Sequence, residues 1–289
     1  IIGIDNLSTG RKEFLKKSID KRNFKFVNED LFTSNSLDEI FKSCELIIHF
    51  SANADVRFGL NQTSKDLNQN TIVTYNILEA MRKNKIKKII FSSTGSVYGE
   101  SKIIPTPEDA NFPIQTSLYA ASKLAAESLI SSYSHGFEIQ SWIFRFVSIL
   151  GPRYSHGHIY DFYKKIINNK NELEVLGNGK QRKSYLHIND CISGMNTAFE
   201  KANELINIFN LGTDDYCEVN DSVEWITKEL NVNPKINYTG GDKGWIGDNP
   251  FIYLDTSKIR NLGWSSKISI KDSILSTLNY LKENQWLIK

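Results

Sequence analysis

Tyr119 and Lys123 stand four residues apart in the segment SLYAASKLAAES, whose composition predicts a helix. Residues at this spacing lie on the same face of a helix, so both side chains emerge together. A tyrosine has a pKa of about 10 in water, and a nearby ammonium group favours its phenolate. The pair could therefore take a proton from a substrate hydroxyl near neutral pH. The alternative is a surface pair that merely shares helical spacing.

A run of small hydroxyl residues ends a predicted strand over residues 87–93. The segment FSSTGSVYG places Ser92, Ser93, Thr94 and Ser96 at this point. The carboxyl ends of strands in open α/β sheets carry the ligand site. A hydroxyl there could hydrogen-bond the oxygen of an alcohol that is being oxidised, although a polar turn would use the same residue types.

The elements that must position these residues alternate between strand and helix through the first half of the chain. Continuous apolar runs predict buried parallel strands, and longer periodic segments predict helices. The predicted strands are residues 1–5, 24–27, 46–50, 87–93 and 139–146, and the predicted helices are residues 38–42, 65–84 and 117–133. This order is typical of a Rossmann-like, doubly wound parallel α/β sheet with helices on both faces.

The composition of the sequence changes after Gly151-Pro152, where aromatic, His, Asn and Gly residues become frequent. We therefore expect one domain over residues 1–150 and a smaller α/β domain over residues 151–289, with some segments returning to the first. The elements predicted there are helices at 159–168, from 190 onward and at 270–282, and strands at 173–176 and 184–188.

Composition excludes several classes of protein. The chain has 289 residues, of which 40% are hydrophobic and 24% charged, as in ordinary globular domains. Thirty-five Lys plus Arg against thirty-three Asp plus Glu leave a net charge of +2, too small to predict binding to nucleic acid or to a membrane. No apolar run approaches the roughly 18 residues that span a bilayer.

Cysteine and histidine usage predicts neither a disulfide framework nor a metal site. The three cysteines, Cys44, Cys191 and Cys217, are odd in number and widely spaced, which favours a reducing cytoplasm. His156 and His158 stand two residues apart on a predicted loop with no acidic partner, and this is poor ligand geometry. We expect no metal.

Five motifs in a fixed order resemble one family. They are STGSVYG, YAASK with Tyr119 placed 25 positions after Thr94, RFVSILGP, GNGKQRKSYLHIND and LDTSKIRNLGW. Together they resemble the extended short-chain dehydrogenase/reductase family, and within it the nucleotide-sugar epimerases and dehydratases of the UDP-glucose 4-epimerase type. The resemblance covers essentially the whole chain. It implies that residues 1–150 bind NAD and that residues 151–289 mainly bind a nucleotide sugar.

The resemblance implies a role for each matching catalytic residue. Tyr119 resembles the catalytic base, Lys123 the residue that binds the nicotinamide ribose and lowers the tyrosine pKa, and Thr94 the hydroxyl that orients the sugar 4-hydroxyl. Asp5 resembles the acid that hydrogen-bonds the adenosine ribose hydroxyls, which implies NAD over NADP. A strand-end carboxylate in a turn is the alternative for Asp5.

Further cofactor residues follow from the same resemblance, in which Asn70 holds a neighbouring backbone segment. The complete set beside Asp5, Tyr119 and Lys123 is Asn6, Leu7, Ser8, Thr9, Gly10, Asp30, Leu31, Phe50, Ser51, Ala52, Asn53, Ala54, Asn70 and Val147.

The residues implied at the substrate lie mainly in the second half. Besides Thr94 and Tyr119 they are Ser96, Ser148, Glu174, Val175, Leu176, Arg182, Lys183, Lys243, Asp248 and Ile252. Glu174 to Leu176 resemble a strand that contacts uracil, and Asp248 an acid that contacts the uridine ribose. A pyrophosphate needs cations or backbone N–H groups. Arg182, Lys183, Lys243 and Arg153 all remain candidates for that contact, with a solvated surface cation as the alternative for each.

Three departures from the family pattern refine the prediction. Gly95-Ser96 stand where 4,6-dehydratases carry Asp-Glu, so the carboxylates for water elimination are missing and epimerisation is favoured. Ser148 replaces a usual asparagine, and Ile252 neither requires nor forbids an N-acetyl group on the sugar. The only G-x-G, at Gly177, is followed by no helix signal. Because Asp5 normally follows the glycine-rich phosphate loop by about 20 residues, we expect that loop to precede Ile1 in the intact protein.

The sequence therefore predicts an NAD-dependent epimerase that acts at C4 of a UDP-hexose through a 4-keto intermediate. The resemblance also implies a homodimer formed through the helices at 65–84 and 117–133. One alternative is a nucleotide-sugar dehydratase, or an oxidoreductase that releases a 4-keto or reduced sugar. Another is a non-catalytic nucleotide-sugar-binding homologue.

Overall fold

A computed structural model describes residues 1–53, 61–111, 114–242 and 251–288. The contacts divide the chain into two compact units. Unit 1 comprises residues 1–92, 117–143 and 204–207, and unit 2 comprises residues 93–116, 144–203 and 208–289. The division falls inside the strands β5 (Gln140–Phe146) and β10 (Ile206–Leu211). The assignment of a cofactor domain to residues 1–150 and a substrate domain to residues 151–289 stays a prediction.

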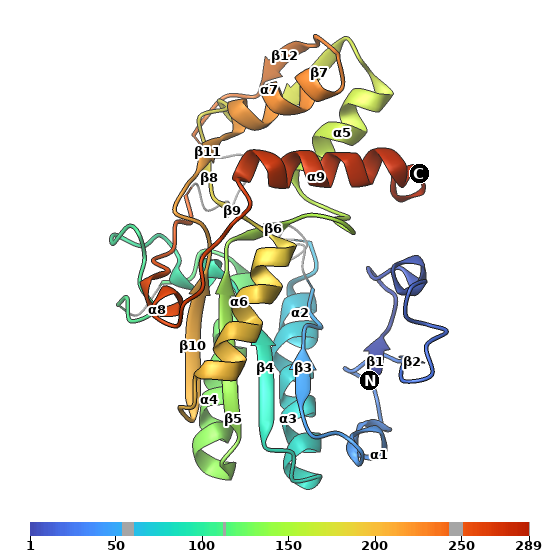
Figure 1. Ribbon diagram of the computed structural model, residues 1–289, viewed down its shortest axis with the longest axis vertical. Coiled ribbons are helices and arrows are strands. Elements are labelled where there is room, and N and C mark those ends of the chain that lie inside the picture. The colour runs from blue at the N-terminus through green and yellow to red at the C-terminus, as the bar shows by residue number, and fades with distance from the viewer. Residues whose placement is uncertain (54–60, 112–113, 243–250, 289) are drawn as a thin grey trace. The chain divides into compact units, whose positions relative to one another are not determined.

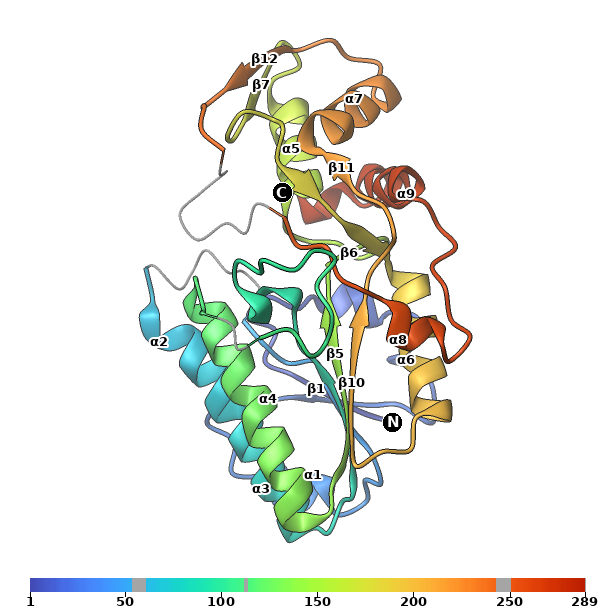
Figure 2. The same ribbon diagram turned by 90° about the vertical axis from the view of Figure 1, so that its left-hand side faces the viewer.

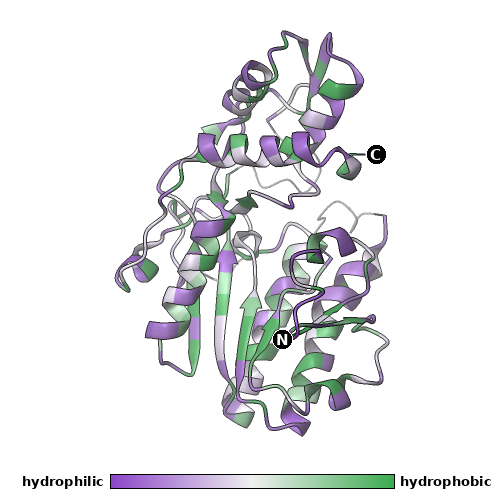
Figure 3. Cartoon of the chain, turned by 45° about the vertical axis from the view of Figure 1, so that its right-hand side comes forward, coloured by the Kyte–Doolittle hydropathy of each residue, from purple (hydrophilic) through white to green (hydrophobic). Residues whose placement is uncertain are grey.

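The central sheet has the strand order β10-β5-β4-β3 (Figure 1). In it, β3 (Ile47–His49) pairs in parallel with β4 (Lys88–Ser92), so that Ile47 lies opposite Ile89. Figure 3 shows hydrophobic residues along these strands, as expected for strands covered on both faces. The predicted α/β class with parallel strands is confirmed.

In the described part of the chain, the first two strands form a parallel sheet of their own. β1 (Ile2–Asp5) pairs with β2 (Lys25–Asn28), with Asp5 opposite Asn28. Both strands agree with the prediction to within about one residue. Between them lies a 3₁₀ helix that the sequence did not predict, and α1 follows them; these elements span Lys12–Leu15 and Leu37–Phe41.

Two helical columns pack side by side in unit 1 (Figure 2). The first was predicted as one helix over residues 65–84. Instead it consists of α2 (Thr63–Asp66), a π-helical turn (Leu67–Ile72) and α3 (Val73–Lys83). The second column is α4 (Leu118–Phe137), whose first turn is capped by Ser117, because the Ser117 side chain accepts a hydrogen bond from the N–H of Ala120.

Unit 2 is built from short paired strands and helices. β6 pairs with β9 and β7 with β12 in parallel, and β8 pairs with β11 antiparallel. Its helices include α9 (Ile270–Glu283), on which hydrophobic and hydrophilic residues alternate between faces (Figure 3). The remaining bounds are β6 Ser148–Leu150, α5 His158–Asn168, β7 Glu172–Val175, β8 Arg182–Lys183, β9 Tyr185–His187, α6 Ile188–Lys201, β11 Cys217–Glu218, α7 Val219–Glu229, β12 Lys235–Tyr238 and α8 Ser257–Arg260.

Asn210 on β10 holds three segments of unit 2 together from a fully buried position. Its Oδ1 accepts a hydrogen bond from the hydroxyl of Tyr98 over 2.9 Å. Its Nδ2 donates to the carbonyl oxygens of Thr106, over 2.9 Å, and Asp255, over 3.0 Å. These bonds satisfy polar groups that water cannot reach, so their loss leaves unpaired donors and acceptors.

We predict that Asn210→Ala lowers the free energy of unfolding by about 3 kcal/mol, because it leaves the buried hydroxyl of Tyr98 without its acceptor and removes a donor from each of two carbonyls. Urea unfolding followed by fluorescence measures this change. Asn203→Ala is the matched control, since the Asn203 side chain is exposed in the same unit. If Asn210→Ala and Asn203→Ala are equally stable, the hydrogen bonds of Asn210 do not stabilise unit 2 as described.

Candidate active site

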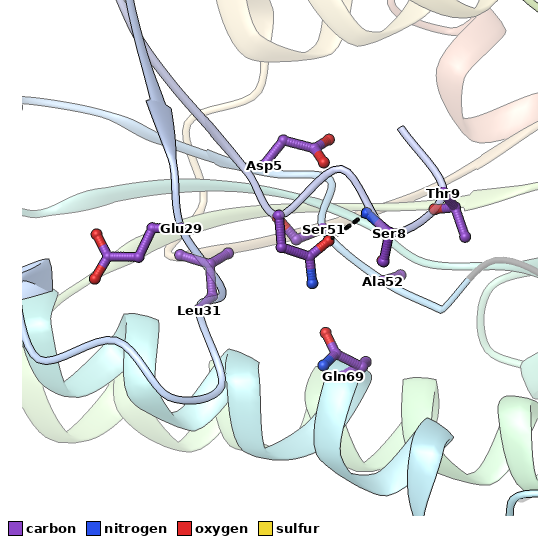
Figure 4. A pocket seen from close by; sticks show the side chains of 9 residues that line it. Asp5, Ser8, Thr9, Glu29, Leu31, Ser51, Ala52 and Gln69 are labelled. Atoms are coloured by element: carbon purple, nitrogen blue, oxygen red, sulfur yellow. Dashed lines mark hydrogen bonds between the residues drawn. The ribbon is translucent and has the colours of Figure 1, made fainter. Parts of the chain in front are cut away.

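A hollow at the end of β1 gathers residues from four separate segments of unit 1 (Figure 4). The lining residues are Asp5, Asn6, Ser8, Thr9, Glu29, Leu31, Ser51, Ala52 and Gln69. All but Glu29 and Gln69 were predicted at the cofactor. These two had a signal in the sequence, because each immediately precedes a predicted cofactor residue, Asp30 or Asn70. We call this hollow the Asp5 pocket.

The turn after β1 closes tightly around the carboxylate of Asp5. Oδ1 of Asp5 accepts a hydrogen bond from the N–H of Leu7 over 2.6 Å, and Leu7 has a left-handed φ of 56°. A Cβ atom added to Gly10 would lie 2.7 Å from Oδ2 of Asp5. A larger residue at position 10 would therefore displace the carboxylate, which explains the glycine physically.

Asn6 connects this turn to the end of β2. Its Nδ2 donates to Oδ2 of Asp30 over 2.9 Å, while its Oδ1 accepts from the N–H of Ser8 over 3.0 Å, the bond drawn in Figure 4. Burial by itself would raise the pKa of Asp30. Hydrogen bonds from Phe32, Asn6 and Gln69 outweigh it, and the pKa is lowered. Asp30, which stands in sequence between the lining residues Glu29 and Leu31, thus carries an ionised carboxylate.

Lys123 is buried on α4, where only 2% of its surface is exposed. Its Nζ donates to the carbonyl oxygen of Ser92 over 2.6 Å and lies 4.4 Å from the ring centre of Phe91. Burial lowers the pKa of Lys123 to about 7, and the charge of Glu127 opposes this shift. Tyr119, one turn earlier, is half-buried. Both residues thus lie on one helix in unit 1.

His49 is a buried, neutral residue that contacts the same Phe91 ring as Lys123. Its ring contacts that of Phe91, with centres 5.2 Å apart, and its Nε2 hydrogen-bonds Oγ1 of Thr74 over 2.9 Å. Burial, with a smaller contribution from the charge of Lys123, lowers the pKa of His49 to about 3. An uncharged imidazole therefore packs beside the buried ammonium group.

Thr94 and Ser96 belong to unit 2, whereas Tyr119 belongs to unit 1. Oγ1 of Thr94 accepts a hydrogen bond from the N–H of Ser96 over 3.1 Å and thereby caps the 3₁₀ helix Gly95–Tyr98. A Cβ atom on Gly95 would lie 2.6 Å from Cγ2 of Ile252. Ile252 therefore fills the space that a side chain at position 95 would need.

The other predicted substrate residues of unit 2 lie in varied surroundings. The Val175 side chain is fully buried, Leu176 is 45% exposed, and Glu174 forms an ion pair with Lys165 over 2.7 Å. Lys183 is half-buried on β8. Their assignment to the substrate stays a prediction.

Two cations and three residues at or next to strand ends complete the described part of the predicted set. The Arg182 guanidinium lies 4.2 Å from the ring centre of Phe251. Arg153 has a left-handed φ of 72°. Ser148 begins β6, Val147 is buried and Phe50 is 54% exposed. Ala54, Lys243 and Asp248 lie outside the described residues.

The described residues contain neither a cluster of metal-ligating side chains nor a membrane-spanning helix. No group of three or more His, Cys, Asp or Glu side chains in residues 1–53, 61–111, 114–242 and 251–288 could hold a metal ion. In the same ranges, none of the helices has the length and apolar character needed to cross a membrane.

Comparison with known proteins decides the family. Residues 1–212 match the NAD dependent epimerase/dehydratase family. The chain belongs to this family. Among the curated members of the NAD-dependent epimerase/dehydratase family, a protein of Methanocaldococcus jannaschii, named provisionally as a UDP-glucose 4-epimerase, is 33% identical over 98% of this chain and 91% of its own length. A UDP-glucuronate 4-epimerase of Thermodesulfobacterium geofontis is 30% identical over 100% of this chain and 90% of its own length.

Solved structures of epimerases share the fold. A UDP-galactose 4-epimerase superposes with a TM-score of 0.87 at 30% identity, covering 99% of this chain and 91% of that one. A UDP-glucuronic acid 4-epimerase of Bacillus cereus, solved with UDP-glucuronic acid and NAD, superposes with a TM-score of 0.88 at 26% identity, covering 98% and 90%. The predicted family and the Rossmann-like fold are confirmed.

The buried Lys123 should make stability depend on pH. Its pKa is depressed to about 7 in the folded state and returns to its ordinary value of 10.5 on unfolding. Between these values the unfolded state binds more protons, so this group's contribution to stability rises with pH. We predict that Lys123→Met, which removes the ionisable group, is stabilised relative to the wild type most strongly below pH 7 and progressively less toward pH 10.

Urea unfolding of the wild type and of Lys123→Met at several pH values measures the difference between their free energies of unfolding. Lys228→Met serves as the control, because Lys228 is exposed on α7 and should give a difference that is constant with pH. A constant difference for Lys123→Met as well would mean that the ammonium group is not desolvated as described.

Proposed function

We propose that the protein interconverts a UDP-hexose and its C4 epimer, with NAD as a cofactor that is regenerated in every turnover. The strongest support is the pairing of Tyr119 with a buried, hydrogen-bonded Lys123 on one helix, in a chain that belongs to an NAD-dependent epimerase family. The relatives named as UDP-sugar 4-epimerases support the substrate class and the carbon that reacts.

The Asp5 pocket supports the cofactor part of the proposal. A carboxylate offers about four lone-pair sites, and Asp5 uses one of them on the N–H of Leu7. The remaining acceptors suit the two vicinal hydroxyls of an adenosine ribose, and a 2′-phosphate would be repelled by the same charge. Ser8 and Thr9 add hydroxyl groups to the same hollow. The residues present therefore fit the adenosine half of NAD.

In the proposed reaction, Tyr119 as phenolate accepts the proton of the sugar 4-hydroxyl. The ammonium form of Lys123 stabilises that phenolate, and Thr94 hydrogen-bonds the same sugar oxygen. NAD, held through its adenosine half by the residues of the Asp5 pocket, would supply a reversible hydride acceptor for C4. The 4-keto sugar then turns over in the site, and Tyr119 returns its proton to the C4 oxygen, which becomes the epimeric hydroxyl.

Gly95 favours epimerisation over dehydration. Elimination of water needs an additional acid and base beside the sugar, and dehydratases resembling this chain carry them directly after the catalytic threonine. Ile252 occupies the space of a Cβ at position 95, and the carbonyl oxygen of Phe146 would lie 3.1 Å from it. An aspartate at this position could not be accommodated without moving Ile252. The reaction therefore stops at the keto stage and reverses.

We predict that Tyr119→Phe lowers the rate of UDP-galactose epimerisation at least about 100-fold, because it removes the proton acceptor. Proton NMR of the sugar nucleotides measures the rate, and calorimetry with UDP tests that binding is kept. Tyr133→Phe is the matched control, since Tyr133 lies on the same helix and donates its hydroxyl to Glu79. It should keep the wild-type rate.

Absence of any epimer from UDP-galactose and from UDP-N-acetylgalactosamine, with NAD bound to the wild type, would overturn the substrate assignment. Net accumulation of reduced cofactor during turnover would favour the oxidoreductase alternative, because an epimerase leaves the cofactor pool unchanged.

We also propose that the protein is a homodimer formed through the two helical columns of unit 1. Large apolar side chains are exposed there, on the π-helical turn at Leu67, on α3 at Tyr75 and on α4 at Leu118 and Phe137. Aromatic residues exposed on adjacent helices are typical of subunit interfaces. The three unpaired cysteines, Cys44, Cys191 and Cys217, support a cytoplasmic location for this dimer.

Tyr75→Lys should convert the dimer to a monomer, because it places an unpaired charge within an apolar interface. Light scattering should then fall from twice 33.0 kDa to 33.0 kDa. Ile192→Lys makes the same change at a side chain that is 49% exposed on α6 and should leave the mass unchanged. A wild-type monomer at micromolar concentration would refute the homodimer.

A further inference from the structure

A series of buried hydrogen bonds in unit 1 joins three segments that are distant in sequence. Asn70, in the π-helical turn, is 1% exposed. Its Oδ1 accepts from the backbone N–H of Asn53 over 2.8 Å, and its Nδ2 donates to Oγ of Ser122 over 2.8 Å. Oγ of Ser122 then donates to the carbonyl oxygen of Tyr119 over 2.7 Å. The bonds therefore run from the segment after β3 to the first turn of α4.

Chemistry permits one direction for each of these bonds. A backbone N–H can only donate, so the amide oxygen of Asn70 must face Asn53 and its NH₂ group must face Ser122. The hydroxyl of Ser122 has a single proton, and because it accepts from Asn70, that proton is directed to Tyr119. A side chain at position 122 must therefore accept and donate at once. A hydroxyl does both, and a methyl group does neither.

The far end of the series belongs to the wall of the Asp5 pocket. Ser51 and Ala52 line that pocket and immediately precede Asn53. Asn53 is held twice, because its Nδ2 also donates to Oδ1 of Asp66 over 2.7 Å, and Asp66 is 1% exposed. A ligand that contacts Ser51 and Ala52 therefore also restrains Asn53, which is hydrogen-bonded to Asn70.

The π-helical turn allows Asp66, Asn70 and Thr74, spaced four residues apart, to face the same buried side of one helical column. In an α-helix of 3.6 residues per turn, positions four apart drift around the axis, and the wider π turn offsets that drift. Asp66, Asn70 and Thr74 are accordingly all buried. Thr74 closes the arrangement, since its Oγ1 donates to the carbonyl oxygen of Asn70 over 2.6 Å.

We propose that Ser122 is a positioning residue whose hydroxyl couples the wall of the cofactor pocket to the helical turn that carries Tyr119. Its catalytic consequence rests on the proposed epimerase function, whereas the coupling itself concerns NAD alone. Occupation of the pocket by the adenosine half of NAD then restrains the first turn of α4 before the sugar nucleotide arrives.

Amide hydrogen exchange of the full chain, with and without NAD as the only added ligand, tests the coupling. In the wild type, NAD should slow exchange at residues 51–53 and also, by about tenfold, at residues 118–123. Ser122→Ala should keep the first effect and lose the second, and Ser122→Thr should retain both. Ser128→Ala is the matched control, because Ser128 also donates to a carbonyl on α4 but lies exposed.

Steady-state kinetics with UDP-galactose test the consequence for the reaction. Ser122→Ala should lower kcat by about 10-fold to 100-fold through misplacement of the base, with KM unchanged, and Ser122→Thr should restore kcat. If Ser122→Ala does not fold, Ser122→Cys carries the same expectation, because a thiol keeps the volume but is a weak donor and acceptor.

NAD protection of residues 118–123 that persists in Ser122→Ala, or an unchanged kcat in that variant, would overturn the proposal. A wild type that shows the NAD coupling but forms no epimer would instead refute the proposed function and leave the coupling standing. The two failures are therefore distinguishable.

Discussion

The burial of one ammonium group, that of Lys123, is the constraint on which the rest of unit 1 depends. A charge removed from water is tolerated only where hydrogen bonds and polarisable groups replace the lost hydration. The carbonyl of Ser92 and the face of Phe91 supply this replacement from the end of β4. Helix α4 is thus tied to one level of the sheet, and Tyr119 is set one turn away from a fixed point.

The sequence was sufficient for the framework of unit 1, because buried parallel strands are continuous apolar runs. The sequence did not predict the local conformation where buried hydrogen bonds of polar side chains determine it. The helix predicted over residues 65–84 is interrupted by the π-helical turn Leu67–Ile72, since buried bonds at Asn70 outweigh regular helical pairing. The strands β10 and β12 and the helix α7 were not predicted, although α7 is amphipathic, with Val219, Val223 and Ile226 buried along one face.

The candidate site divides in the same way. A turn that follows a strand is visible in sequence, and seven of the nine residues that line the Asp5 pocket belong to the predicted cofactor set. The hydrogen bond between Asn53 and Asp66 was not predicted, because thirteen residues separate the two side chains and Asn53 was expected only at the cofactor. Asp66 is buried where α2 packs against α4, and packing between segments so far apart in sequence leaves no local pattern.

The contact between Gly95 and Ile252 has a consequence for how this chain could diverge. A single substitution that introduced an acidic side chain at position 95 would meet the methyl group of Ile252 and disturb the loop before any new chemistry could operate. A smaller residue at position 252 would relieve that contact at no gain of its own, while the carbonyl oxygen of Phe146 would still lie 3.1 Å from the added Cβ. Evolution from an epimerase toward a dehydratase is therefore epistatic here, and the permissive change must precede the functional one.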